Sequence, residues 1–274
     1  MANYTELREG DTLPTVGVLQ KLLNRVGAGL KVDGVFGSKT SVAVRAFRKI
    51  QDPRADGVVD EATWTQLIAG NPLPIEDCID VFDPALYEGD AKNIMGTGAD
   101  PLLIGGMSDG LARAVRDIRR RASGVFLLRF IGHGRKGFQG VSDGKGGWDE
   151  FPVGRPGRRK PKAIWHDFGD QIAQLHYRSA LVMGQSRLQE IFSPYGSIEL
   201  HGCNVGAGSE GRRFVTTLAR ALGIPVSAAA GFGARGWQVS TFRFDGPVFT
   251  AFPLGTNLSK WCGALPDLPL TSTP

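Results

Sequence analysis

The chain has 274 residues, of which 42% are hydrophobic and 22% charged, a composition that excludes a mainly disordered or fibrous protein. Its formal net charge is +5, and most of this excess comes from one short basic run between positions 155 and 162. A nucleic-acid-binding protein usually spreads its basic charge over a face, so we expect no nucleic-acid partner. No apolar run approaches the ~18 residues of a membrane helix, and the polar start does not read as a secretory signal. Three scattered cysteines predict neither a disulfide framework nor a metal site, and we expect no cofactor.

The first 70 residues contain a short internal repeat. Asp33-Gly34 recurs as Asp56-Gly57, and each pair is followed by a segment with helical periodicity. Asp-Gly favours a tight turn. Upstream, a stripe of apolar residues with helical spacing ends at Gly27, which suits a helix C-terminus. The pattern predicts three short helices joined by Asp-Gly turns.

These segments carry a specific resemblance. LQKLLNRVG, VDGVFGSKTSVAVRAFRKIQ and ADGVVDEATWTQL resemble a type-1, three-helix peptidoglycan-binding domain, with Arg48 where that family usually has Gln. The resemblance implies a shallow groove that holds cell-wall peptide or glycan without catalysis, and Asp33, Phe36 and Trp64 are the candidate substrate-binding residues. The alternative is a generic helical bundle with Trp64 and Phe47 in its core.

Four segments make up the predicted organisation: a peptidoglycan-binding domain at 1–70, a linker at 71–77, a second domain at 78–264 and a flexible tail at 265–274. In the second domain, apolar strands alternate with amphipathic helices. We expect strands at 125–131, 197–201 and 224–227, helices at 111–122 and 214–222, and a terminal hairpin within 231–254. Ser209 and Gly223 are the expected caps of the second helix. This order predicts an α/β sandwich with a mostly parallel sheet.

Two motifs directly follow predicted strands. The first is Gly132-His133-Gly134, and the second is His201-Gly202-Cys203. Ligands bind at the carboxyl ends of strands in open α/β sheets, so the two motifs are expected to act together. A thiol becomes a nucleophile when an imidazole takes its proton, and glycine-flanked backbone N–H groups can stabilise an oxyanion.

The same motifs resemble the caspase-like (clan CD) cysteine peptidases, and more closely the bacterial domain of unknown function DUF4347. IGHGRKG and IELHGCNVGAGSEGRRFVTTLARALGIPVSAAAG carry the resemblance. It implies that His133 is the general base, Cys203 the nucleophile, and the N–H groups of Gly134 and Cys203 the oxyanion donors. Gly202 replaces the alanine usual in the clan. The alternatives are an inert buried Cys203, a structural His133, or His201 as the base.

The segment 132–162 is rich in glycine and ends in the basic run. It is either a solvated surface loop or a lid for an anionic polymer, in which case Trp148 and Arg158 are candidate substrate-binding residues. Acidic residues gather in and just after it, and a glycosidase could draw its two carboxylates from them; they are Asp143, Asp149, Glu150, Asp167 and Asp170. No role is assigned to Cys78 or Cys262.

Taken together, the sequence predicts a peptidoglycan-targeted bacterial hydrolase, a cysteine peptidase or amidase that cleaves amide bonds in cell-wall peptides. The alternatives are a muramidase-type glycan hydrolase, a non-catalytic wall-binding protein with a degenerate caspase-like fold, and an enzyme that cleaves proteins at the wall. Peptidoglycan is the expected partner. We expect either a secreted antibacterial effector or a phage lysin. A secretion apparatus and a cognate immunity protein are the further expected partners. We expect synthesis in the bacterial cytoplasm and action at the cell wall or periplasm after export by a non-classical route.

Overall fold

The computed structural model describes residues 4–49, 55–68, 73–80, 100–104, 110–132, 134–139, 187–230, 242–244 and 246–268. Its N-terminal part consists of helices α1 (Pro14–Arg25), α2 (Ser38–Arg48) and α3 (Glu61–Ile68). The predicted three-helix arrangement is therefore confirmed. Proline in the first turn suits the start of α1, because its missing N–H would have no partner inside the helix.

The first Asp-Gly turn is held from inside the domain. Gly34 adopts a left-handed backbone conformation with φ +76°, which glycine reaches without a steric cost. The carboxylate of Asp33 accepts the N–H of Val35 at 3.0 Å. The buried amide of Gln20 accepts the N–H groups of both Asp33 and Gly34 at 2.9 Å. One side chain from α1 thus fixes the turn that leads toward α2.

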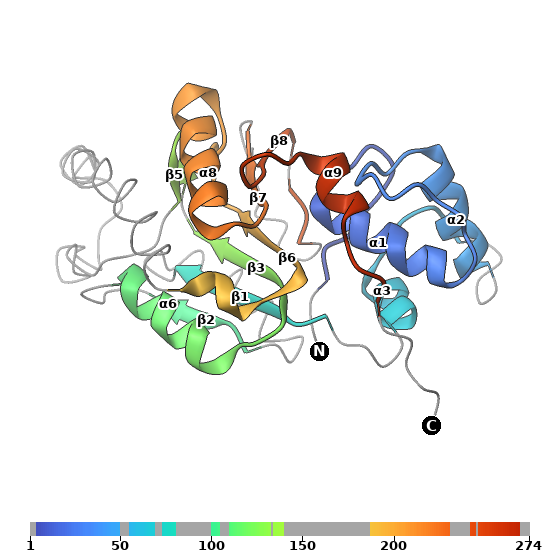
Figure 1. Cartoon of the computed structure of the whole chain (residues 1–274), viewed down its shortest axis with the longest axis horizontal. Coiled ribbons are helices and arrows are strands. Elements are labelled where there is room, and N and C mark those ends of the chain that lie inside the picture. The colour runs from blue at the N-terminus through green and yellow to red at the C-terminus, as the bar shows by residue number, and fades with distance from the viewer. Residues whose placement is uncertain are drawn as a thin grey trace, which may run out of the picture.

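The rest of the described chain is built around a six-stranded sheet of order β2-β1-β3-β6-β7-β8 (Figure 1). Its strands are β1 (Ile75–Asp80), β2 (Leu102–Ile104), β3 (Val125–Ile131), β6 (Phe192–Leu200), β7 (Val226–Ala229) and β8 (Val248–Ala251). The first five strands of this order are parallel, and β8 is antiparallel to β7. The predicted mostly parallel α/β sheet is confirmed. Of the hairpin predicted within 231–254, the structure describes one strand, β8, and this strand pairs with β7, which lies before that range.

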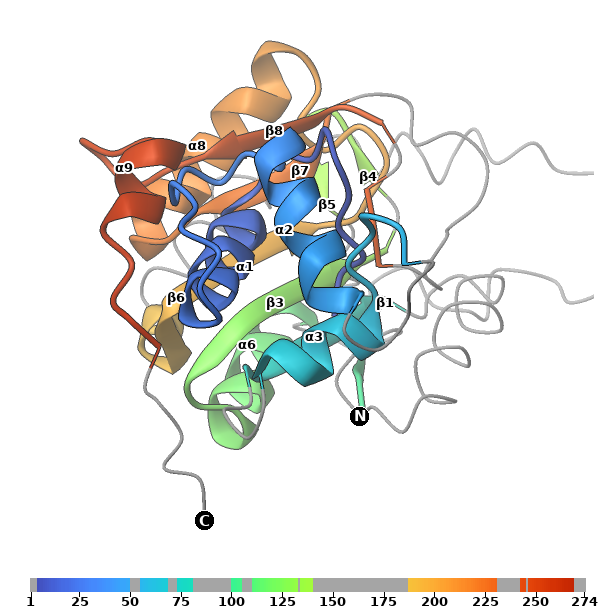
Figure 2. The same cartoon turned by 90° about the vertical axis from the view of Figure 1, so that its right-hand side faces the viewer.

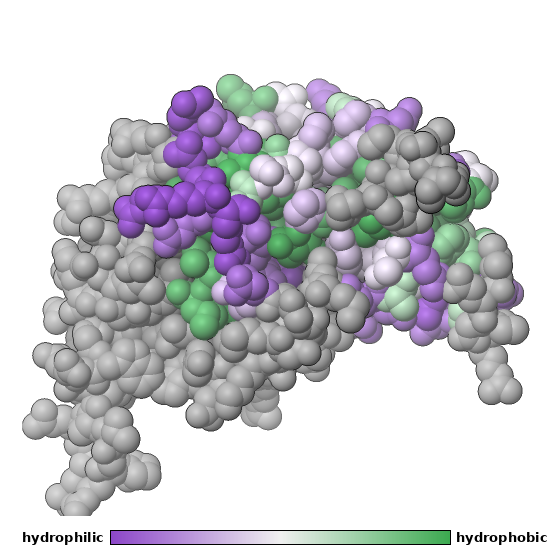
Figure 3. All heavy atoms as spheres, turned by 90° about the horizontal axis from the view of Figure 1, so that it is seen from below, coloured by the Kyte–Doolittle hydropathy of each residue, from purple (hydrophilic) through white to green (hydrophobic). Residues whose placement is uncertain are grey.

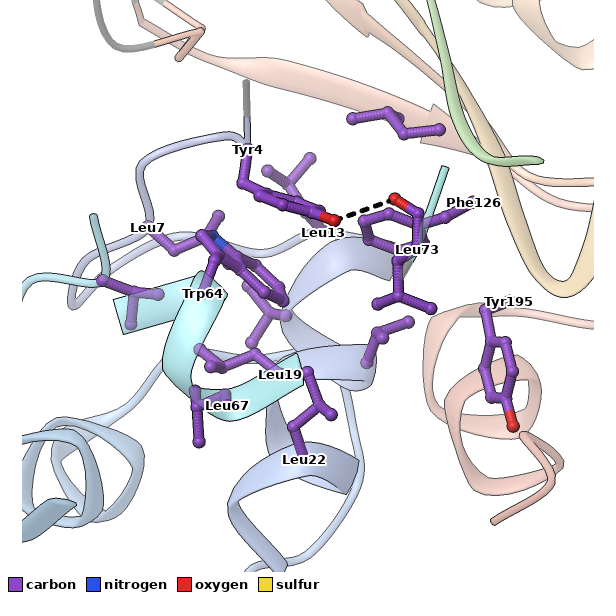
Figure 4. Close-up of a cluster of buried hydrophobic side chains, with 14 of the residues drawn as sticks. Tyr4, Leu7, Leu13, Leu19, Leu22, Trp64, Leu67, Leu73, Phe126 and Tyr195 are labelled. Carbon is purple, nitrogen blue, oxygen red and sulfur yellow. Dashed lines mark hydrogen bonds between the residues drawn. The ribbon is translucent and has the colours of Figure 1, made fainter. Parts of the chain in front are cut away.

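The two faces of the sheet are covered differently. Helices α6 (Gly110–Arg121) and α8 (Gly208–Leu222) pack on one face together with the 3-10 turn η3 (Leu188–Ile191). The N-terminal helices cover the other face (Figures 1 and 2). Trp64 of α3 lies 6.2 Å from the ring of Phe126 on β3, and Tyr4 stacks on Trp64 at 5.5 Å (Figure 4). The three-helix domain therefore shares a hydrophobic core with the sheet.

Several predicted boundaries shift in the structure. Strand β1 begins at Ile75, so the last part of the predicted 71–77 linker is strand, because residues 75–79 pair with β3. Leu265 and Leu268 are 5% exposed, so the predicted flexible tail does not begin at 265: these side chains join the shared core. Ser209 lies inside α8 rather than at its cap, which is Ala207, whereas Gly223 is the left-handed C-cap that was predicted.

The outer surface of α6 is basic. Arg116, Arg119 and Arg120 are exposed, while Val115 and Ile118 on the opposite side of the helix are buried. From below, strongly hydrophilic side chains gather over this helix (Figure 3). No helix within the described ranges combines the length and the apolar character that crossing a membrane requires.

Candidate functional site

The two predicted motifs lie at the same edge of the sheet. Strands β3 and β6 are parallel neighbours, and β3 ends at Ile131 while β6 ends at Leu200. The pairing continues one residue further, because the N–H of His201 donates to the carbonyl of Phe130 at 2.9 Å. The segments that follow the two strands therefore leave the sheet side by side. His133 itself falls outside the described residues.

The backbones of the two motifs are in direct contact. A Cβ atom built on Gly134 would lie 2.5 Å from the carbonyl carbon of Gly202 and 2.7 Å from the nitrogen of Cys203. Only glycine tolerates such an approach. The N–H of Gly202 also donates to the side-chain oxygen of Gln139 at 2.8 Å. Gln139 belongs to the small hairpin of β4 (Gly134–Arg135) and β5 (Phe138–Gln139), so this hairpin fixes the start of the cysteine loop.

Cys203 opens the turn between β6 and α8. Its side chain is partly exposed, whereas Cys78 and Cys262 are 1% and 0% exposed. The next residue, Asn204, has φ 59°, a left-handed conformation that costs free energy in a non-glycine residue and is enriched at functional sites. The N–H of Gly206 then donates to the carbonyl of Ala229 at the end of β7, at 2.7 Å. The most accessible of the three thiols is therefore held on a constrained loop at the carboxyl end of the sheet.

His201 lies beside this loop but faces another partner. Its Nε2 lies 2.9 Å from Oε2 of Glu199, and its ring stacks on Phe244 with centroids 4.5 Å apart. Glu199 is 1% exposed, so its carboxylate is available mainly to the imidazole. As period-two alternation predicts, His201 and Glu199 share one face of β6. That face is the one covered by the N-terminal helices, so the geometry favours a positioning or structural role for His201.

A row of polar residues, buried except for the half-buried Thr250, crosses this same face, and the sequence reasoning missed it. Its members pair in register from strand to strand: Asp77, Arg129, Glu199, Ser227 and Thr250. Arg129 is fully buried, donates to both carboxylate oxygens of Asp77 at 2.6 and 2.8 Å, and carries the Phe242 ring 4.0 Å above its guanidinium. The available signal was an arginine within the otherwise apolar segment 125–131. A buried charge of this kind needs a partner, and Asp77 supplies it.

The N-terminal candidates divide into two groups. Phe36 and Trp64 are 0% exposed, and the indole N–H of Trp64 donates to the carbonyl of Thr5 at 2.8 Å. Their prediction as groove residues is therefore wrong, because both rings fill the core. Asp33 keeps 25% of its side chain exposed and stabilises the Asp-Gly turn. It is the predicted residue of this domain that a ligand can still reach.

Other predicted residues cannot be placed. Trp148, Arg158 and the acidic residues between 143 and 170 lie outside the described residues. Across the part of the chain that the structure describes, no group of three or more His, Cys, Asp or Glu side chains is arranged to hold a metal ion.

Comparisons with known proteins bear on both halves of the chain. The family model for a peptidoglycan-binding domain matches residues 12–67, and the model for the domain of unknown function DUF4347 matches residues 172–235. No curated protein matches the sequence.

Two solved structures are similar to parts of the chain. One is a peptidoglycan-binding protein from Clostridioides difficile in complex with glutamine hydroxamate: it is 34% identical, with a TM-score of 0.23, over 24% of this chain and 42% of that one. The other is the endolysin of Burkholderia phage AP3: it is 30% identical, with a TM-score of 0.23, over 42% of this chain and 38% of that one. The chain thus spans less than half the length of either protein. The peptidoglycan-binding family model thus matches the three-helix part of the chain, and the DUF4347 model matches the region that includes Cys203.

Proposed function

We propose that the protein is a peptidoglycan-directed hydrolase in which Cys203 attacks amide bonds of cell-wall peptides. The N-terminal domain supplies the targeting to peptidoglycan. The observation that carries the catalytic proposal is the backbone contact between Gly134 and Gly202–Cys203, because it joins the two sequence motifs at the carboxyl edge of the sheet. The mostly parallel sheet also agrees with what the caspase-like resemblance implied.

In the proposed reaction, His133 takes the proton of the Cys203 thiol, and the sulfur attacks the amide carbonyl carbon. The backbone N–H groups of Gly134 and Cys203 stabilise the resulting oxyanion. The C–N bond breaks as His133 returns the proton to the leaving amine, which leaves a thioester on Cys203. Water, deprotonated by the same imidazole, then releases the carboxylate and restores the thiol.

The test is mass spectrometry of the soluble fragments that the purified protein releases from sacculi. We expect peptide-cleaved fragments from the wild type and none from Cys203→Ala or His133→Ala. His201→Ala is the matched histidine control, and we expect it to keep activity, because Glu199 rather than the thiol engages its ring. Loss of activity in His201→Ala alone would reassign the base.

Other outcomes identify the alternatives. Glycan fragments with intact peptides, released equally by the wild type and Cys203→Ala, would indicate a muramidase. Binding to sacculi without any release would indicate a wall-binding protein or one that cleaves another protein there. Iodoacetamide gives an independent check: it should label the partly exposed Cys203 before the two buried thiols and abolish activity in proportion.

A further inference from the structure

Residues 258–268 pack against the N-terminal three-helix domain. After β8, helix α9 (Leu258–Gly263) begins at Asn257, whose side chain caps it by accepting the N–H of Lys260 at 3.0 Å. The helix lies beside α1 (Figure 2), and Leu265 and Leu268 follow it into the shared core. We call residues 258–268 the C-terminal strap. Its contacts on α1 and on the first Asp-Gly turn lie more than 200 residues earlier in the sequence.

The strap fills a hollow in the N-terminal domain. The floor of this hollow is formed by the backbone of two glycines. A Cβ atom on Gly17 of α1 would lie 2.4 Å from the sulfur of Cys262. A Cβ atom on Gly34 would lie 2.8 Å from the same sulfur and 2.6 Å from Cδ1 of Leu258. Two glycines, one in a helix and one in the Asp-Gly turn, therefore leave room for these side chains.

The floor of the hollow does not depend on the strap. The turn at Gly34 is held by Gln20 and by the N–H of Leu13, which donates to the Gly34 carbonyl at 3.1 Å. All of these residues lie within the matched domain at 12–67. Lifting the strap would uncover this glycine-lined surface next to Asp33, the one predicted ligand residue that is not buried in the core.

The rim of the hollow adds a charge. Nζ of Lys21 lies 2.8 Å from the carboxylate of Asp267 in the strap, and the two side chains are 18% and 94% exposed. The occupant of the hollow therefore presents small or medium apolar side chains followed by a carboxylate. An anionic peptide with small apolar side chains would satisfy the same contacts, and cell-wall peptides have both features.

We propose that this hollow is the wall-peptide site of the N-terminal domain and that the C-terminal strap occupies it as an intramolecular substitute until the wall displaces it. The proposal rests on wall binding as proposed above, but not on cysteine catalysis. Because ligand and strap exclude each other, the apparent dissociation constant rises as the fraction of open molecules falls. The strap would thus restrain binding until the local concentration of wall peptide is high.

The first test compares sacculus binding by the full chain with that of Leu258→Ala, which removes an apolar contact on Gly34 and leaves the floor intact. We expect the variant to bind roughly threefold to tenfold more tightly, as the loss of about 0.7 to 1.4 kcal/mol of strap contact would produce. Leu254→Ala is the matched control, since Leu254 is 82% exposed and lies before the strap. A purely structural strap would predict a lower melting temperature without tighter binding, and that result would overturn the proposal.

The second test needs no variant. Cys262 reports on the strap because burial, together with the nearby Asp33 charge, raises its pKa to about 12 and keeps the thiol unreactive at neutral pH. Peptide mapping after alkylation should show faster labelling of Cys262 when soluble wall peptides are added. Wall binding with Cys262 still protected would refute this inference and leave the proposed function intact. Absence of any binding to sacculi would remove both.

Discussion

At the level of single residues, the absence of a side chain at Gly134 lets the two motif loops pack against each other. Gly134 and Gly202 approach so tightly that a methyl group on Gly134 would lie within 2.5 to 2.7 Å of three backbone atoms of residues 202 and 203. Backbone cannot move aside as a flexible side chain can, so the loops would have to separate. The position of the Cys203 backbone thus depends on the absence of a side chain at position 134.

We therefore expect Gly134→Ala to lower the free energy of unfolding by about 1 to 3 kcal/mol, as overpacking usually does, and to lower fragment release from sacculi. Urea unfolding and the release assay measure the two effects. Gly263→Ala is the matched control for the unfolding measurement, since nothing lies within 4 Å of a Cβ at that position. Equal stability in the two variants would contradict the close approach.

Cys262 gives a second prediction at this scale. Its pKa in the folded protein is about 12 against an ordinary value of 9.0, so folding favours the neutral thiol. The stabilisation is complete below pH 9 and is lost as the pH rises toward 12, by at most about 1.4 kcal/mol per pH unit. Urea unfolding at pH 8 and pH 10 should show this loss in the wild type and a smaller one in Cys262→Ala. Tyr4, whose pKa burial also raises, contributes with the same sign above pH 10.

At the scale of elements, the two Asp-Gly turns are held in the same way by different side chains. Gln20 donates to Asp33 and to the carbonyl of Val35. Arg48 donates to Asp56 and to the carbonyl of Val58, the equivalent atoms of the second turn. The sequence repeat is therefore also a structural repeat. The two copies differ in the side chain that holds the turn, which is Gln20 in the first and Arg48 in the second.

Arg48→Ala should cost about 1 to 2 kcal/mol of stability, because it removes the hydrogen bonds that hold the second turn. Arg48→Gln, which restores the residue usual in the family, should recover most of the loss. Thermal unfolding of the three proteins measures this. An alanine variant as stable as the wild type would mean that solvent replaces the guanidinium, as it does at many exposed ion pairs.

In the whole molecule, the N-terminal three-helix domain is a layer of the fold rather than a separate module on a flexible linker. Its helices and the sheet share one hydrophobic core through Trp64, Phe126 and Phe244, and the strap closes over it. Neither part can lose its partner without exposing apolar surface to water.

Unfolding should therefore be a single cooperative transition. Phe126→Ala should lower the stability of both parts together by about 3 to 5 kcal/mol, whereas Val42→Ala, at a site 61% exposed, should have little effect. Tryptophan fluorescence and far-ultraviolet circular dichroism should give coincident curves. Two separate transitions would show that the layers fold independently.

Local patterns in the sequence were enough to predict the main helices and strands and the proximity of the two motifs. The apolar run at 125–131, the cap at Gly223 and the Asp-Gly turns were all predictable, because periodicity and turn chemistry act over a few residues. The approach of the two motifs was predictable too, because parallel strands end at one edge.

Which side chains face the core and which partners they contact could be read only from the three-dimensional fold. The same aromatic pattern suits a binding groove or a core, and the contact with Phe126 placed Trp64 in the core. Arg129 lies within an otherwise apolar strand, and its partner Asp77 comes from another strand far away in the sequence. The strap was missed because its contacts join residues that are far apart in sequence. Such contacts depend on which surfaces the whole fold brings together, and no local pattern encodes that.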